Sequence, residues 1–135
     1  MVMTKTLLLV TNNGKALETY GAHSEIGVDY LEERSYLDVL IRVRDLVHEG
    51  WHLMSHPQAS NLKPNQSPYK TVLLSNGREI QPFAQDVEMV ENSIEAFHKF
   101  TRGMIPPRWP EKALRDFQTI DLSVVESAMD RALRL

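Results

Sequence analysis

The chain has 135 residues, of which 42% are hydrophobic and 24% are charged, and its formal net charge is −3. That length suits one domain with one core, and the average composition excludes a disordered or fibrous chain. The acidic balance argues against nucleic-acid binding, and the absence of cysteine excludes disulfides, thiolate nucleophiles and cysteine-ligated metal centres. The first apolar run is too short for a signal peptide or a membrane span, so we expect a cytoplasmic protein that contacts no membrane.

The chain opens with a strand, helix, strand pattern. Thr6–Val10 is a short apolar run that ends in the turn Thr11–Gly14, which predicts a buried strand. Lys15–His23 predicts a short helix, and the β-formers of Val28–Glu33 predict a second strand near the sheet edge.

The clearest predicted helix is Ser35–Glu49. Ser35 stands three residues before Asp38 in a capping-box arrangement, apolar residues recur every three or four positions, and Gly50 provides a stop. Trp51–Ser55 then predicts a third strand, which the chain enters directly from the helix.

A fourth strand is predicted at Tyr69–Ser75. The dipeptide Asn76-Gly77 follows it and is a strong hairpin signal, so we expect Arg78–Gln81 to pair back as a short edge strand. A long amphipathic helix is predicted over Asp86–Arg102.

Residues 103–110 predict a proline-rich linker within the domain, because their prolines disfavour helix. Pro110 is expected to open a short helix over Glu111–Phe117, and Asp121 to cap a last helix. The apolar stripe of that helix either packs on the sheet or forms a homodimer contact through Leu122, Val125, Met129 and Leu133.

This order of elements predicts an α/β fold. We expect a single small three-layer domain over residues 1–135, with a mostly parallel sheet of about four to five strands, a hairpin and C-terminal helices. Ligands of such sheets collect beyond the carboxyl ends of the strands. The turn Thr11–Gly14 and the loop that begins at His56 should therefore lie at the same rim.

The loop between the third and fourth strands is rich in proline and in polar side chains, which is typical of a binding loop. Its lysines and amides suit a small polar or anionic metabolite, although the chain lacks both the dinucleotide and the Walker phosphate motifs. The alternative is that asparagine and serine only satisfy turn backbone while the lysines are solvated. The predicted ligand-binding residues are Asn12, Asn13, His56, Lys63, Asn65, Ser67, Tyr69 and Lys70, with Asn61 as a further amide.

Three histidines, His48, His52 and His56, recur at every fourth position. They do not predict a metal site, because Gly50 breaks the helix and a strand holds residues four apart at about 13 Å. We predict no metal, no cofactor and no catalytic set. His56, at the strand end, is the candidate for a general base, with Ser60 or Ser67 folding toward it.

Two segments resemble a known family. S-Y-L-D-V-L-I-R-V-R-D-L-V-H-E-G-W-H-L-M-S-H-P at Ser35–Pro57 and S-N-L-K-P-N-Q-S-P-Y-K-T-V-L-L at Ser60–Leu74, together with the early T-N-N, are similar to the GrdX family. The resemblance implies an association with the glycine, sarcosine and betaine reductase components of amino-acid-fermenting bacteria, and it brings no catalytic residues with it.

The leading hypothesis is a non-catalytic accessory protein that binds a small ligand or an anion at the rim and associates with reductase components. One alternative is a small hydrolase or transferase for a phosphorylated or acyl metabolite, with His56 as base and Lys63 or Lys70 stabilising charge. The other alternative is a homodimeric interaction scaffold.

Overall fold

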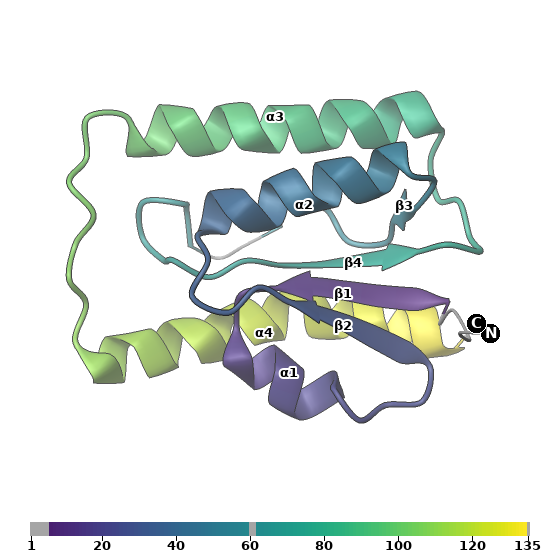
Figure 1. Cartoon of the computed structure of the whole chain (residues 1–135), viewed down its shortest axis with the longest axis horizontal. Helices are drawn as coiled ribbons and strands as arrows, with labels where there is room; N and C mark the ends of the chain where they lie inside the picture. The colour runs from purple at the N-terminus through teal and green to yellow at the C-terminus, as the bar shows by residue number, and fades with distance from the viewer. Residues whose placement is uncertain (1–5, 60–61, 135) are drawn as a thin grey trace.

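A computed structural model of the chain, shown in Figure 1, describes residues 6–59 and 62–134. In chain order the elements are β1 (Leu7–Thr11), α1 (Gly14–Tyr20), β2 (Ile26–Tyr30), α2 (Tyr36–His48), β3 (His52–Leu53), β4 (Thr71–Ser75), α3 (Phe83–Thr101) and α4 (Glu111–Arg134). The predicted α/β class is therefore confirmed. Within the described ranges, every helix is too short or too polar to cross a membrane.

The sheet has four strands in the order β2-β1-β4-β3. β1 and β2 are parallel, whereas β4 is antiparallel to both of its neighbours. The expectation of a mostly parallel sheet of about four to five strands is thus corrected to a mixed, four-stranded sheet. The reason lies in the long loop after β3, which carries the chain past the end of β1 before β4 begins, so that β4 must run back.

The register places three strand ends at one edge of the sheet. Thr11, the last residue of β1, pairs with Tyr30 at the end of β2 and with Thr71 at the start of β4. We call this the carboxyl edge, because β1 and β2 both end there. It is the place where polar side chains following those strands can meet.

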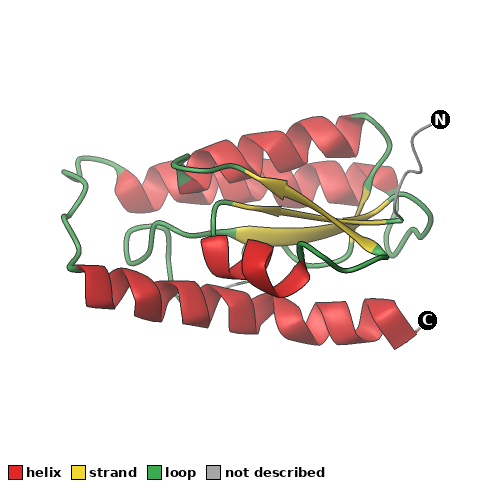
Figure 2. Cartoon of the chain, turned by 60° about the horizontal axis from the view of Figure 1, so that its bottom comes forward, coloured by secondary structure: helices red, strands yellow, loops and turns green. Residues whose placement is uncertain are grey.

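Helices cover both faces of the sheet, as Figures 1 and 2 show. Leu7, Leu9 and Leu73 point to the face covered by α1 and α4, and pack with Val125 and Met129 of α4. The alternate residues of β1 and β4 pack against α2 and α3 on the other face. The sheet is consequently the middle layer of three, as predicted, because strand side chains alternate between faces.

The predicted hairpin is wrong. The Asn76-Gly77 turn does form, and Oγ of Ser75 accepts hydrogen bonds from the backbone N–H groups of Gly77 and Arg78, each at 3.1 Å. Residues 78–81 nevertheless form no strand. Since β4 already lies between β1 and β3, neither of its edges is left for a returning strand.

α2 begins as the sequence predicts. Oγ of Ser35 accepts from the N–H of Asp38 at 3.1 Å, and Oδ2 of Asp38 accepts from the N–H of Ser35 at 3.0 Å. This reciprocal capping box fixes the first turn. α3 begins earlier than predicted, at Phe83 rather than Asp86.

The predicted break at Asp121 is also wrong. α4 is one continuous helix, so Asp121 lies in its middle and does not cap a helix, and its side chain is buried. In the apolar stripe, Val125 and Met129 pack on the sheet within the same chain, whereas Leu133 is partly exposed.

Candidate functional site

Asn12 joins the turn after β1 to the loop before β4. Its side-chain amide donates to the carbonyl oxygens of Arg34 and Pro68, both at 2.9 Å, and its Oδ1 accepts from the backbone N–H of Lys70 at 2.9 Å. The two segments that the sequence places at one rim therefore meet there. The amide of Asn12 is used in full by the fold, and its side chain is buried.

Asn13 is engaged in the same way. Its Oδ1 caps α1 by accepting from the N–H of Lys15 at 3.0 Å, and its Nδ2 donates to Gln118 O at 2.8 Å and to Asp121 Oδ2 at 3.0 Å. Asn13 is completely buried. Both predicted amide donors thus hold the carboxyl edge together, a structural role that turn residues commonly have.

Lys70 is the unexpected member of the predicted set, because its side chain is only 1% exposed. Its Nζ donates to Ala59 O at 3.1 Å and lies 5.5 Å from the centre of the Tyr36 ring. Burial lowers the pKa of Lys70 to about 8, against the opposing effect of Asp121. The ammonium group is therefore an interior charge that the fold has to accommodate.

Asp121 is the buried group of opposite charge. Its Oδ2 accepts from Thr71 Oγ1 at 2.6 Å as well as from Asn13. Burial raises the pKa of Asp121, while the hydrogen bonds from Thr71 and Asn13 and the charge of Lys70 act to lower it. The hydroxyl of Thr11 lies 2.7 Å from that of Thr71, so one buried polar network links β1, β4 and α4.

His56 makes a local hydrogen bond where the loop after β3 begins. Its Nδ1 accepts from the N–H of Gln58 at 2.9 Å, and both burial and the charge of Lys70 lower its pKa. A neutral ring that accepts at Nδ1 carries its proton on Nε2, so neither nitrogen offers a free lone pair. Ser67 is engaged locally through the N–H of Tyr69 at 3.2 Å, and Ser60 and Asn61 lie outside the described residues.

The remaining predicted residues are dispersed. Lys63 is exposed and stands 4.6 Å from the centre of the Phe100 ring, while Tyr69 accepts from Gln118 Nε2 at 3.0 Å through its hydroxyl. Oδ1 of Asn65 is buried and has no hydrogen-bond partner among the described residues. The eight predicted residues thus do not converge on one ligand site.

An open cleft does lie at the carboxyl edge. It has a volume of about 640 Å³, and two of the predicted residues, Asn12 and Tyr69, form part of its wall. The charged groups around it were not predicted from the sequence: they are Arg34, Arg108, Glu32 and Glu33. We call this the carboxyl-edge cleft.

Arg34 and Arg108 give the cleft its positive charge. Both side chains are exposed, and no described residue forms an ion pair with either guanidinium group. Arg34 follows a predicted strand end closely enough to have been identified from the sequence. Arg108 lies in the proline-rich linker, and nothing in the sequence indicates that this linker returns to the same edge.

The family model described as GrdX-like protein matches residues 8–130. The chain belongs to the GrdX-like protein family. The matched range runs from β1 into α4, so it includes the buried network and the carboxyl-edge cleft. No match was found among curated proteins or among solved structures.

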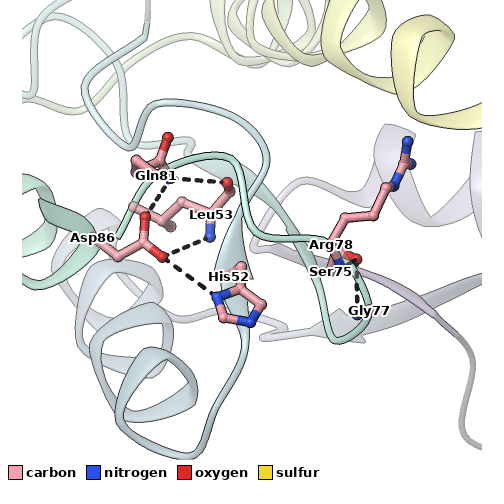
Figure 3. A network of polar contacts seen from close by, with 7 residues as sticks. All are labelled: His52, Leu53, Ser75, Gly77, Arg78, Gln81 and Asp86. Atoms are coloured by element: carbon pink, nitrogen blue, oxygen red, sulfur yellow. Dashed lines mark hydrogen bonds and ion pairs between the residues drawn. The ribbon is translucent and has the colours of Figure 1, made fainter. Parts of the chain in front are cut away.

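A second polar cluster of this GrdX-like chain lies at the other end of the strands, where β3 begins and β4 ends (Figure 3). The buried carboxylate of Asp86 accepts from the N–H of Leu53 at 3.4 Å and from Nε2 of Gln81, and lies 3.9 Å from Nδ1 of His52. These contacts fasten the first turn of α3 to β3, which gives the cluster a structural role. His52 therefore faces Asp86, while His56 binds Gln58, so the two histidines serve different parts of the fold.

Proposed function

We propose that this GrdX-like protein is a non-catalytic accessory component of the glycine, sarcosine and betaine reductase system, and that it binds a small carboxylate-bearing ligand in the carboxyl-edge cleft. The family supports the association with that system. The observation that carries the ligand is the convergence of Arg34 and Arg108, from distant parts of the chain, on one cleft without an ion-pair partner among the described residues.

The chemistry of the cleft favours a ligand that carries both signs of charge. A guanidinium group matches a carboxylate through two parallel hydrogen bonds, so either arginine suits a small carboxylic acid. Glu32 and Glu33 stand at the same cleft and suit an ammonium group. A zwitterion of the amino-acid type satisfies both sets, whereas phosphate would meet the glutamates as a like charge.

The backbone at the cleft supports this choice. Glu33 has a φ of 58°, in the left-handed region that costs a side chain about 1 kcal/mol or more. Such strain is concentrated at binding and switch segments, where it fixes a side chain in a direction that relaxed backbone would not give it. Glu33 is one of the two acidic residues that line the cleft.

The state of the polar side chains supports a binding role over a catalytic one. The hydrolase alternative requires His56 as a base, and its Nδ1 is already occupied by Gln58. Of the two lysines that this alternative offers to stabilise charge, Lys70 is buried beneath the loop, whereas Lys63 is exposed. The chain has no cysteine and so cannot relay thiol redox equivalents itself.

Isothermal titration calorimetry with glycine, betaine, acetyl phosphate and inorganic phosphate tests the ligand. We expect saturable binding of a zwitterion, weakened about tenfold or more by Arg34→Ala or Arg108→Ala, since a lost charge-assisted hydrogen bond is worth about 1.5–3 kcal/mol. Arg131→Ala is the matched control, because Arg131 is an exposed arginine of α4 outside the cleft.

Two results would count against the proposal. The proposed ligand binding is contradicted if none of the four compounds gives saturable heat, or if neither cleft variant changes the binding. The association is tested separately by a pull-down with purified reductase components, and a clean negative there removes the accessory role.

A further inference from the structure

Three aromatic side chains line the carboxyl-edge cleft together with its charged groups. Tyr30 is the last residue of β2, Tyr69 lies in the loop before β4, and Trp109 lies in the proline-rich linker. Each is partly buried, so the fold holds the ring while part of its surface stays accessible. The pairing of a guanidinium group with a carboxylate does not account for three aromatic residues at one cleft.

Contacts within the chain hold the two tyrosines by their hydroxyl ends. The Tyr30 hydroxyl lies beside Gly14, where an added Cβ would be only 3.4 Å from it. The Tyr69 hydroxyl accepts from Nε2 of Gln118 at 3.0 Å. Because Gly14 and Gln118 line the same cleft, both tyrosines are fixed at its wall.

Trp109 is held by an aromatic neighbour. Its ring meets that of Phe117 edge to face, with the ring centres 5.5 Å apart and an interplanar angle of 84°. Within the described ranges, no lysine or arginine stands over the ring of Trp109 or of either cleft tyrosine. The cleft therefore has three aromatic rings that hold no cation of the protein itself.

The charge around Tyr30 is negative. Burial and then the charge of Glu32 raise the pKa of the Tyr30 hydroxyl, and Glu33 acts in the same direction. Both glutamates are exposed, so they stay hydrated and attract a cation without having to bind its N–H groups. Since an aromatic face attracts a cation through its quadrupole, rings and carboxylates act together on a positively charged group.

An N-methylated ammonium group suits aromatic walls better than a primary ammonium group. A primary ammonium is compact and strongly hydrated, and it needs an acceptor for each of its N–H groups. Methyl groups remove that need and contact the ring faces directly, which is how aromatic cages recognise quaternary ammonium ligands.

We propose that the carboxyl-edge cleft selects an N-methylated ammonium carboxylate, with its methyl groups against Tyr30, Tyr69 and Trp109 and its carboxylate at the two arginines. This inference rests on the proposed function, because it requires that the cleft binds a zwitterion. It goes further by naming the methylation of the ammonium group as the property that the cleft distinguishes.

Glycine, betaine and 3,3-dimethylbutanoate test the selection on the unaltered protein. Betaine is the trimethylated form of glycine, and 3,3-dimethylbutanoate has the shape and the carboxylate of betaine with carbon in place of the charged nitrogen. In calorimetric titrations we expect betaine to bind about tenfold more tightly than either of the other two, the combined effect of several ring contacts with a cation.

Trp109→Leu removes one ring and keeps an apolar side chain, so it should lower the preference for betaine over glycine by about two- to fivefold. Trp109→Phe, which restores an aromatic face, should recover most of that preference. Phe83→Leu is the matched control, because Phe83 is an exposed aromatic residue of α3 outside the cleft, and it should leave the preference unchanged.

The outcomes separate this inference from the proposed function. Glycine binding as tightly as betaine overturns the selection and leaves zwitterion binding in place. Equal binding of betaine and 3,3-dimethylbutanoate overturns the recognition of a cation by the rings. Absence of binding by all three compounds contradicts the proposed function and the selection with it. The comparison of the three compounds needs no variant, so it stands even if Trp109→Leu does not fold.

Discussion

The backbone N–H of Lys70 donates to Oδ1 of Asn12 at 2.9 Å, across 58 positions of sequence. The side-chain amide of Asn12 also donates to Pro68 O. The turn that ends β1 therefore positions the backbone just before β4. Asn12, which the sequence suggests as a ligand contact, thus also has a structural role at the carboxyl edge.

Asn12→Ala should destabilise the protein. The substitution removes three hydrogen bonds and leaves Arg34 O, Pro68 O and Lys70 N–H without their partner, so we expect the free energy of unfolding to fall by about 2–4 kcal/mol. Urea unfolding measures this change in the free energy of unfolding. The control is Asn92→Ala, at an exposed position of α3, which should stay within about 0.5 kcal/mol of the unaltered chain. Equal stability of the two variants would show that the Asn12 network contributes nothing.

The buried Lys70 should make stability rise with pH. Its pKa is about 8 in the folded chain against 10.5 as the model value, so between these pH values the unfolded chain binds more protons at this lysine. The free energy of unfolding therefore increases with pH in this window, by about 1.4 kcal/mol for each pH unit. Below pH 8 this contribution is flat.

Urea unfolding at pH 7, 8 and 9.5 tests this rise, with about 2 kcal/mol expected over the last interval. Tyr36, whose pKa burial raises to about 12, acts in the opposite direction only above its usual pKa of 10.0, so it does not interfere. Lys70→Met should show no such rise, and Lys63→Met, at an exposed lysine, should retain it. The same pH slope in Lys70→Met would assign the effect to other groups.

Asp121→Ala should lower the free energy of unfolding more than substitution of an exposed acidic residue of α4. Its carboxylate accepts from Thr71 and Asn13, and it is the buried counter-charge of Lys70. Removal of one partner from a buried network of this kind costs about 3–5 kcal/mol. Asp116→Ala, on the exposed face of the same helix, is the matched control, with a change within about 0.5 kcal/mol. Thermal unfolding followed by circular dichroism separates the two, and similar melting temperatures would contradict the structural role of Asp121.

Asp86→Ala should loosen the attachment of α3 to β3. The substitution leaves the N–H of Leu53 without its acceptor at a fully buried position and removes one of the two acceptors of the Gln81 amide, which keeps its bond to Leu53 O (Figure 3), so we expect a loss of about 2–3 kcal/mol. Hydrogen exchange of the Leu53 amide should accelerate at the same time. Glu95→Ala, at an exposed position of α3, serves as the comparison, and unchanged protection of Leu53 in Asp86→Ala would disprove the attachment.

The sequence alone determined the features that depend on neighbouring residues. The buried strand β1 and the capped start of α2 were predicted from short patterns, since apolar runs and capping boxes act within a few residues. The meeting of the β1 turn with the later loop was also predicted, because β1 and β3 run in the same direction and their following segments reach the same edge.

Only the tertiary structure decided the features that depend on distant residues. β4 is enclosed by β1 and β3, which prevents the hairpin that Asn76-Gly77 favours locally. Asp121 has the character of a helix cap, yet Thr71 and Asn13 bind it in the middle of α4. Arg34 and Arg108 form one cleft because the linker folds back over the carboxyl edge, a contact between distant segments that no local pattern encodes.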